Sequence, residues 1–157
     1  MQFRSLMLIF VSFALFACGN DGKFSEAEIE AQDTAWQTMF DAHDEVMPLT
    51  LRDIPDTVEE LEELAADAMV EANDFHPRAQ QAIADLNAAE EGMQVWMKTI
   101  GENQKKKLRE RMATHEEIMA FIKAQTDFIN QVAEDTHSSI KAGEALIALR
   151  KGNDTNE

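Results

Sequence analysis

Apolar side chains recur every three or four residues from Phe24 to Lys151, and this helical period is the strongest signal in the chain. Runs that alternate apolar and polar residues, which would indicate β-strands, are missing from the sequence, as are hairpin turns between such runs. The pattern therefore predicts an all-α fold for residues 24–151.

The first helix is expected to begin at Ser25, because Ser25 and Glu28 have the spacing of a capping box. Pro48 lies inside its apolar stripe, where a proline kinks or ends a helix, and Pro55 is expected to end whatever remains. The stripe comprises Ile29, Trp36, Met39, Phe40, His43, Val46, Met47, Thr50 and Ile54.

The second helix is expected to take Asp56 or Thr57 as its N-cap and to end at Gly101. Its apolar positions alternate in steps of four and three without a slip, straight through Pro77. This phase predicts one long helix that is kinked near Pro77. A true break, with Asp74 as a new N-cap, is the alternative.

A third helix is expected to run from the capping box of Thr114 and Glu117 to Lys151, after a polar linker over residues 102–113. An antiparallel bundle of three long helices, with coiled-coil-like seams, is the simplest assembly. A four-helix bundle is the alternative if the chain breaks at residues 73–77.

The first seventeen residues have the proportions of an export signal. The apolar run at 6–16 is too short to span a bilayer, which takes about 20 residues. Residues 15–18, Leu-Phe-Ala-Cys, resemble the lipobox of bacterial lipoproteins, in which lipid is attached to the cysteine. We therefore expect a lipoprotein signal peptide at 1–17, the lipidated Cys18 and a tether at 18–23, the bundle at 24–151 and a disordered tail at 152–157. A plain signal peptide cut after Ala17, or an uncleaved anchor, is the alternative.

The lipobox resemblance implies two or three acyl chains on Cys18, which would anchor the chain stably in a membrane. Gly19 follows the cysteine, and by analogy with well-studied lipoproteins it gives no signal for retention in the inner membrane. We expect a protein of the bacterial cell envelope, held in the outer rather than the inner membrane, with its bundle in the periplasm or at the cell surface.

Charge and cysteine content narrow the function classes. With 14 Lys and Arg against 30 Asp and Glu, the net charge of −16 argues against nucleic acid as a partner, because phosphate binding needs basic residues. Cys18 is the only cysteine, which excludes an intramolecular disulfide and a Cys-rich zinc site.

The charges are distributed unevenly along the chain. Residues 24–74 carry sixteen acids and only one base, Arg52. Residues 103–113 carry five bases, which either lie against this acidic surface or form an interaction patch for anionic lipid or an acidic partner. The candidate patch comprises Lys105, Lys106, Lys107, Arg109 and Arg111.

His43 and Met47 are the first candidates for cofactor chemistry. They are four residues apart on the apolar stripe and project from one helix face. An imidazole nitrogen and a thioether suit copper(I), and they also suit the axial positions of a haem. The competing interpretation is a core histidine that is bonded to Asp44 or a backbone carbonyl, with Met47 as filler.

Other catalytic signatures are weak. Glu134 and His137 form one Glu-x-x-His, whereas a di-iron bundle needs two. Met93, Trp96 and Met97 have the spacing either of core residues or of a ligand pocket. The sequence offers no nucleophile with a positioned base, so we do not expect an enzyme.

Several stretches together resemble one family, the small lipoproteins of the Bacteroidetes known as "viral A-type inclusion protein". The closest resemblance is at 43–48, His-Asp-Glu-Val-Met-Pro, and looser resemblances lie at 93–97, 116–121 and 139–146. The resemblance implies an all-helical bundle on a lipid anchor and implies no activity.

The leading functional hypothesis is a non-catalytic structural or interaction module of the envelope. Its partners would be the membrane, through Cys18, and another envelope protein or a second copy of itself. No cofactor is expected under this hypothesis. The alternative is a copper- or haem-binding bundle that uses His43 and Met47.

Overall fold

The computed structural model describes residues 22–68 and 74–154, and every element in these ranges is helical. The all-α prediction is therefore confirmed. None of the helices in the described ranges is long and apolar enough to cross a membrane. The elements are α1 (Glu26–Pro48), the π-helical segment η1 (Leu49–Asp53), α2 (Ile54–Ala68), α3 (Phe75–Glu102), α4 (Lys105–Arg111) and α5 (His115–Asp154).

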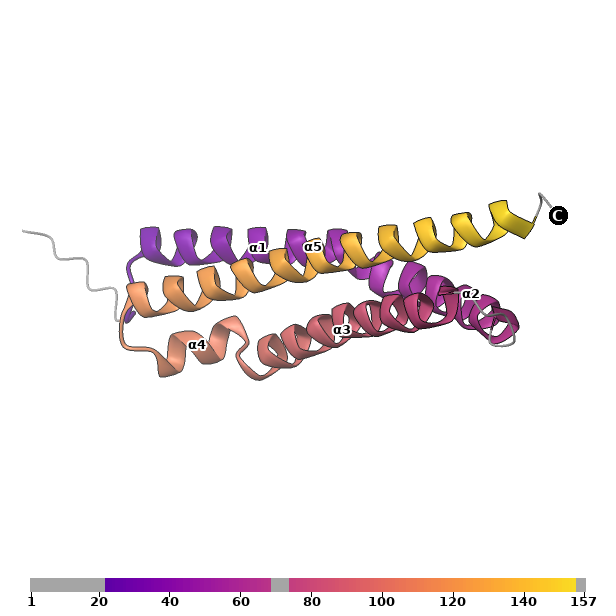
Figure 1. Ribbon diagram of the computed structural model, residues 1–157. Helices are drawn as coiled ribbons and strands as arrows, with labels where there is room; N and C mark the ends of the chain where they lie inside the picture. The colour runs from indigo at the N-terminus through magenta and orange to yellow at the C-terminus, as the bar shows by residue number, and fades with distance from the viewer. Residues whose placement is uncertain (1–21, 69–73, 155–157) are drawn as a thin grey trace, which may run out of the picture.

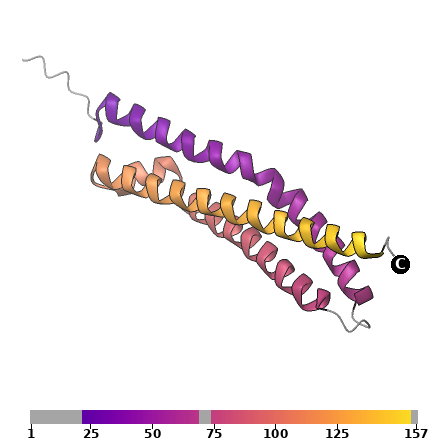
Figure 2. The same cartoon turned by 45° about the horizontal axis from the view of Figure 1, so that its top comes forward.

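The helix α5 runs the length of the molecule and contacts α1, α2 and α3 (Figure 1). Its 40 residues extend over about 60 Å. The start of α1, all of α4 and the start of α5 lie at one end of the bundle, and the C-terminus lies at the other (Figures 1 and 2). The chain therefore forms an elongated bundle whose two ends carry different elements.

The first helical rod does not stop at its prolines, so the expected end at Pro55 is wrong. It continues from α1 through η1 into α2 and bends there (Figure 2). Between Pro48 and Pro55 the hydrogen bonding widens, since the amide of Ile54 donates to the carbonyl of Leu49, five residues back. A π-helical turn and a proline are both recognised causes of a kink. Pro55 falls in the first turn of α2, where its missing amide costs little.

The helices α2 (Ile54–Ala68) and α3 (Phe75–Glu102) are separate elements that pack against each other, so the expected continuous helix through Pro77 is wrong. Asp74 is the N-cap residue of α3, as the alternative had it, although its side chain makes no capping hydrogen bond. Pro77 lies in the first turn of α3, where a proline is tolerated. The predicted count of three long helices is accordingly not confirmed.

The expected polar linker over residues 102–113 contains the helix α4. Leu108 explains this difference, because its side chain is fully buried and holds α4 against the bundle. The sequence conceals this, since Leu108 is a single apolar residue among five bases.

Both predicted capping boxes are present. Ser25 accepts from the amide of Glu28 at 3.3 Å, and the Ser25 amide donates to the Glu28 carboxylate at 2.8 Å. Thr114 and Glu117 exchange the equivalent bonds at 3.2 and 3.1 Å. Each box satisfies two amides that a helix start leaves without partners.

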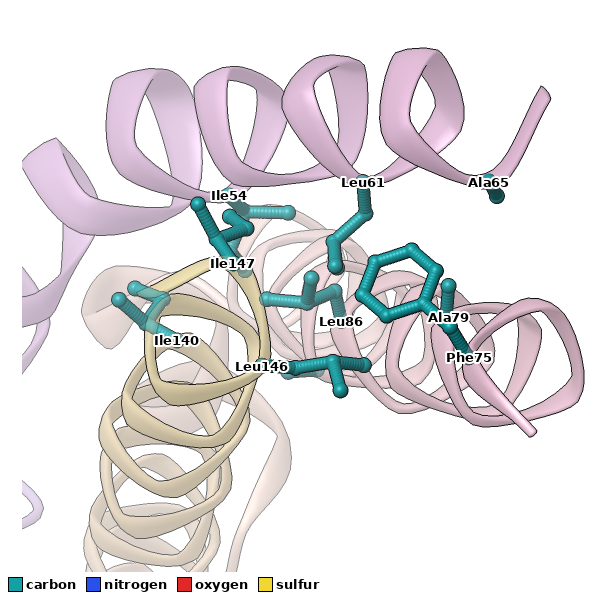
Figure 3. Packing of buried hydrophobic residues seen from close by; sticks show 10 residues of the cluster. Ile54, Leu61, Ala65, Phe75, Ala79, Leu86, Ile140, Leu146 and Ile147 are labelled. Atoms are coloured by element: carbon teal, nitrogen blue, oxygen red, sulfur yellow. The ribbon is translucent and has the colours of Figure 1, made fainter. Parts of the chain in front are cut away.

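The core consists of two apolar clusters that follow one another along α5. The first cluster, between α2, α3 and the second half of α5, includes Leu61, Leu86 and Leu146 (Figure 3). The second cluster, between α1, α3 and the first half of α5, includes Trp96 and Ile122. Each cluster therefore belongs to one limb of the bent rod.

Buried hydroxyl groups lie between the two clusters. Along α5 the clusters are separated by Thr136 and Ser139, and along the bent rod by Thr50, all three of which are buried. The Ser139 hydroxyl donates to the Thr136 carbonyl at 3.1 Å, and Thr50 donates to the carbonyl of Met47 at 2.8 Å. The Ser139 and Thr50 hydroxyls therefore bond to their own helical rods, whereas the buried Thr136 hydroxyl has no hydrogen-bond partner among the described residues. This layer adds polarity to the core without bonding the helices to one another.

At Gly143, the helix α5 approaches α2 too closely to leave room for a side chain. A methyl group added there would lie 2.6 Å from Cγ2 of Thr57 and 3.4 Å from Cδ1 of Leu61. We expect Gly143→Ala to lower the free energy of unfolding by about 1–3 kcal/mol, because this core has no room for another carbon. Urea unfolding followed by circular dichroism measures the change.

Gly101 is the matched control, since an added methyl group meets nothing within 4 Å there. Because alanine is the better helix former, Gly101→Ala should raise the stability by about 0.5–1 kcal/mol. Combining Gly143→Ala with Thr57→Ser, which removes the obstructing methyl group, should recover most of the loss. Equal effects at Gly143 and Gly101 would contradict the close approach.

Candidate functional site

Four aromatic rings from two helices meet on one side of the bundle. Trp36, Phe40 and His43 come from α1, and Trp96 comes from α3. The Trp96 side chain is 1% exposed, and its Nε1 donates to the backbone carbonyl of Gln125 in α5 at 2.9 Å. Trp96 is therefore held across the core and gives the other rings a fixed wall.

The rings adopt the geometries that their quadrupoles favour. His43 stacks on Trp96, with centroids 5.0 Å apart and an interplanar angle of 19°. Phe40 meets Trp96 edge to face at 5.7 Å and 68°. Trp36 lies 5.7 Å from Phe40 in a tilted arrangement.

These rings line an open cleft of about 440 Å³ between α1, α3 and the start of α4. Small-molecule sites usually have volumes in this range. Met97 lies in the lining with 38% of its surface exposed. We refer to this site as the aromatic cleft; its other lining residues are Ile100, Gly101, Gln104 and Lys105.

His43 forms part of the wall of the aromatic cleft. Its side chain is 14% exposed, and Nδ1 lies 2.8 Å from Oδ1 of Asp44. With one face on Trp96 and Nδ1 on a carboxylate, the ring has the arrangement expected of a core histidine bonded to Asp44.

Met47 is half-buried and packs against the second apolar cluster. The Thr50 hydroxyl lies 3.8 Å from the Met47 sulfur. In the described part of the chain, no three or more His, Cys, Asp or Glu side chains are placed to hold a metal ion. A site made of one histidine and one methionine does not require such a group, so the copper or haem hypothesis for His43 and Met47 stays a prediction.

Glu134 and His137 line a separate cavity of about 510 Å³ between α1 and α5. Glu45 of α1 lies in the same lining. Although these are ligand-type side chains, they are not placed together as a set of three or more that could hold a metal ion, and the described part of the chain has no such set.

A polar network fastens α4 to the first turns of α1. Arg109 donates from Nε to Oε1 of Gln32 at 2.7 Å. Its Nη2 donates to the carbonyl of Ile29 at 3.1 Å and to Oδ1 of Asp33 at 2.6 Å. Gln32 is fully buried, and its Nε2 lies 3.2 Å from Nδ1 of His115 at the start of α5. Because the Gln32 side chain is buried away from solvent, its Oε1 needs a hydrogen-bond partner within the protein, and Arg109 supplies it.

The five bases of the candidate patch fall into two sets. Lys105 and Arg109 turn toward α1, where the Lys105 ammonium lies 2.7 Å from the Asp33 carboxylate. The other three bases are exposed on the outer side of α4. Lys105 and Arg109 therefore lie against the acidic helix α1, which was one of the two interpretations of the basic segment. The three exposed bases remain a candidate interaction patch. The exposed set comprises Lys106, Lys107 and Arg111.

The fold and the site define a class of protein, an elongated helical bundle with an aromatic cleft near one end. No family model, no curated protein and no solved structure matches the chain.

Sequence reasoning found part of the cleft and missed the rest. Met93 and Trp96 are buried core residues, and Trp96 and Met97 also line the cleft, so both interpretations of this segment apply. The network of Gln32 and Arg109 gave no signal, because a glutamine and an arginine 77 positions apart have no characteristic spacing.

The cations of α4 lower the pKa of Asp33 below its ordinary value of 3.8. The hydrogen bond from Lys105 is the largest cause, burial opposes it, and Arg109 adds to the lowering. A lowered folded-state pKa means that this interaction stabilises the fold above the unfolded-state pKa, and that the contribution is lost as the pH falls through the folded-state pKa.

We therefore expect Asp33→Asn to lower the free energy of unfolding at pH 7 by about 0.5–1 kcal/mol, a small value because solvent screens a carboxylate that is 43% exposed. The difference from the unaltered chain should shrink as the pH falls below about 4. Asp41→Asn is the control, since Asp41 lies on the same helix and accepts from the neutral Gln37. Urea unfolding between pH 7 and pH 3 measures both variants, and a deficit that is constant over this range would contradict the ion pair.

Proposed function

We propose that the chain is a non-catalytic interaction module of the bacterial cell envelope, anchored through lipid on Cys18. The outer membrane is the proposed location, with the bundle in the periplasm or at the cell surface. The resemblance of residues 15–18 to a lipobox supports the anchor. The aromatic cleft supports the interaction function, and it is the single observation on which the function rests.

The cleft favours a particular chemistry in its partner. Its walls are aromatic and held in place, so they suit an aromatic or aliphatic side chain. Two lining residues of α1 are followed in sequence by an acidic residue: Asp41 follows Phe40 and is exposed, and Asp44 follows His43, with its carboxylate 71% exposed. We infer that the partner is an envelope protein, or a second copy of this chain, that presents an apolar side chain flanked by Lys or Arg.

The first test concerns the anchor. Cys18→Ser should move the protein from the membrane fraction to the non-membrane fraction and abolish incorporation of labelled palmitate. The physical reason is that each buried methylene contributes about 0.8 kcal/mol and two or more chains are needed for stable anchoring. Cell fractionation with metabolic labelling measures both effects. A Cys18→Ser protein that stays in the membrane would contradict the lipid anchor and favour an uncleaved anchor.

The second test concerns the cleft. We expect a photo-crosslinking phenylalanine analogue in place of Met97 to give one discrete adduct in intact cells, because this side chain is exposed at the cleft. Leu51 is the matched position, since it is an exposed apolar residue on η1 outside the cleft lining. The adduct is identified by mass spectrometry, and one of twice the chain mass would identify a second copy as the partner.

Charge reversal separates specific binding from chance contact. Asp41→Lys, at the position after the lining residue Phe40, should weaken the Met97 adduct, whereas Asp67→Lys on α2 should leave it unchanged. The same set of adducts at Met97 and Leu51, insensitive to Asp41→Lys, would argue against the cleft as the interaction site.

A further inference from the structure

The helix α4 is tied to the chain segment that follows the proposed lipid attachment site. The ammonium of Lys23 donates to the carbonyls of Arg109 and Met112, at the C-terminal end of α4. Arg109 lies in the last turn of α4, where carbonyls lack partners within the helix and carry the negative end of the helix dipole, and Met112 is the C-cap residue. Lys23 therefore acts as a charged cap that holds α4 beside the start of the bundle.

This contact limits how far α4 can lie from the membrane. Lys23 is five residues after Cys18, and five residues span at most about 17 Å. Since Lys23 is bonded to α4, the helix must lie close to the membrane surface whenever Cys18 carries lipid in that membrane. This step rests on the lipid anchor that we propose above.

The side of α4 turned away from the bundle is basic. Leu108 is buried, and Lys105 and Arg109 are bonded to Asp33, so these residues face inward. The outward bases make only weak or neutral contacts. Lys106 lies 3.9 Å from Glu110 with both side chains exposed, and Arg111 donates to the amide oxygen of Asn103 at 2.7 Å. The exposed set comprises Lys106, Lys107 and Arg111.

The acidic charge on most of the bent rod favours one orientation of the bundle at an anionic membrane, with the basic side of α4 toward it. Residues 24–74 carry sixteen acids against one base, so most of the bent rod is repelled by an anionic surface. Basic residues close to a bilayer are attracted to anionic lipid, and this attraction falls off within about 8 Å in physiological salt. At the end of the bundle near the anchor, the first turns of α1 and α5 are acidic, with Glu26, Glu28, Glu116 and Glu117. Among the described residues at this end, the basic surface is the outer side of α4.

We propose that Lys106, Lys107 and Arg111 contact the head groups of anionic phospholipids and hold the anchored bundle with α4 against the membrane. The C-terminal end of α5, which lies at the opposite end of the bundle (Figure 1), then points away from the bilayer. The aromatic cleft stays beside the membrane, because Lys105 at the start of α4 is part of its lining.

The test couples the mature chain, residues 18–157, to vesicles through its only thiol. Cys18 is joined to a maleimide lipid in vesicles of phosphatidylcholine alone or with one part in three of phosphatidylglycerol. Surface amines are then acylated briefly, and the modification of Lys106 is compared by mass spectrometry with that of Lys151, near the end of α5. We expect modification of Lys106 to slow by about fivefold on the anionic vesicles relative to the neutral ones, and 0.5 M NaCl to abolish the difference.

Paired variants identify the residues responsible. Lys107→Gln with Arg111→Gln should remove most of the protection of Lys106. Lys123→Gln with Lys141→Gln changes the net charge equally, at exposed positions on α5, and should leave the protection intact. The side chains exchanged in both pairs are exposed, so the fold is expected to tolerate them.

Each other outcome overturns the proposal in a specific way. Equal modification of Lys106 on both kinds of vesicle would show that anionic lipid is not the ligand. Protection on both kinds that resists salt would show mere proximity to the bilayer. Equal protection of the uncoupled chain by polyglutamate would indicate an acidic protein as the partner. Because the thioether supplies the attachment in this test, its result does not depend on acylation of Cys18 in cells, which the Cys18→Ser fractionation measures separately.

Discussion

The bend between Pro48 and Pro55 determines which surfaces of the chain meet. Two prolines seven positions apart remove two amides from one continuous helical rod, and the chain between them widens into a π-helical turn and continues. Because α2 leaves the line of α1, the rod packs against the first half of α5 with one limb and against its second half with the other. The two apolar clusters, with the buried hydroxyls between them, correspond to these two limbs of the rod. A straight rod would present its stripe to a single face of α5.

The first limb of the rod, α1, contributes to both the aromatic cleft and the attachment of α4. Its apolar face supplies three of the four rings of the cleft, the fourth being Trp96 of α3, and its polar face supplies Gln32 and Asp33, which hold α4. The same helix therefore forms one wall of the cleft and positions the short helix that closes its end. The seven-residue basic helix α4 is held against the bundle by three contacts: the buried Leu108, the bond from Arg109 to the fully buried Gln32 and the ion pair of Lys105 with Asp33.

The sequence predicted the local features of the fold better than the places where the rods end. Periodicity and capping residues depend on neighbours within one turn, so the boxes at Ser25 and Thr114 were found correctly. Helix ends at prolines depend on packing that the sequence does not display. Pro55 was expected to end a helix and instead lies in the first turn of α2, and the unbroken phase through Pro77 concealed the separation of α2 from α3. The apolar positions of α2 and α3 keep one phase across the break, and those on either side of it pack into the same apolar cluster.

The cleft and the outer side of α4 share an element, and this raises the question of whether they act on one another. Lys105 lines the cleft at one end of α4, and Lys23 binds the carbonyls at the other end, across a helix about 10 Å long. Coupling between two sites requires an element with two alternative positions that each site favours differently. Leu108 is fully buried and Arg109 is bonded to three groups on α1, so α4 is held in one position. The two surfaces are therefore expected to work independently, with the outer side of α4 setting the orientation of the bundle and the aromatic cleft selecting what the bundle binds.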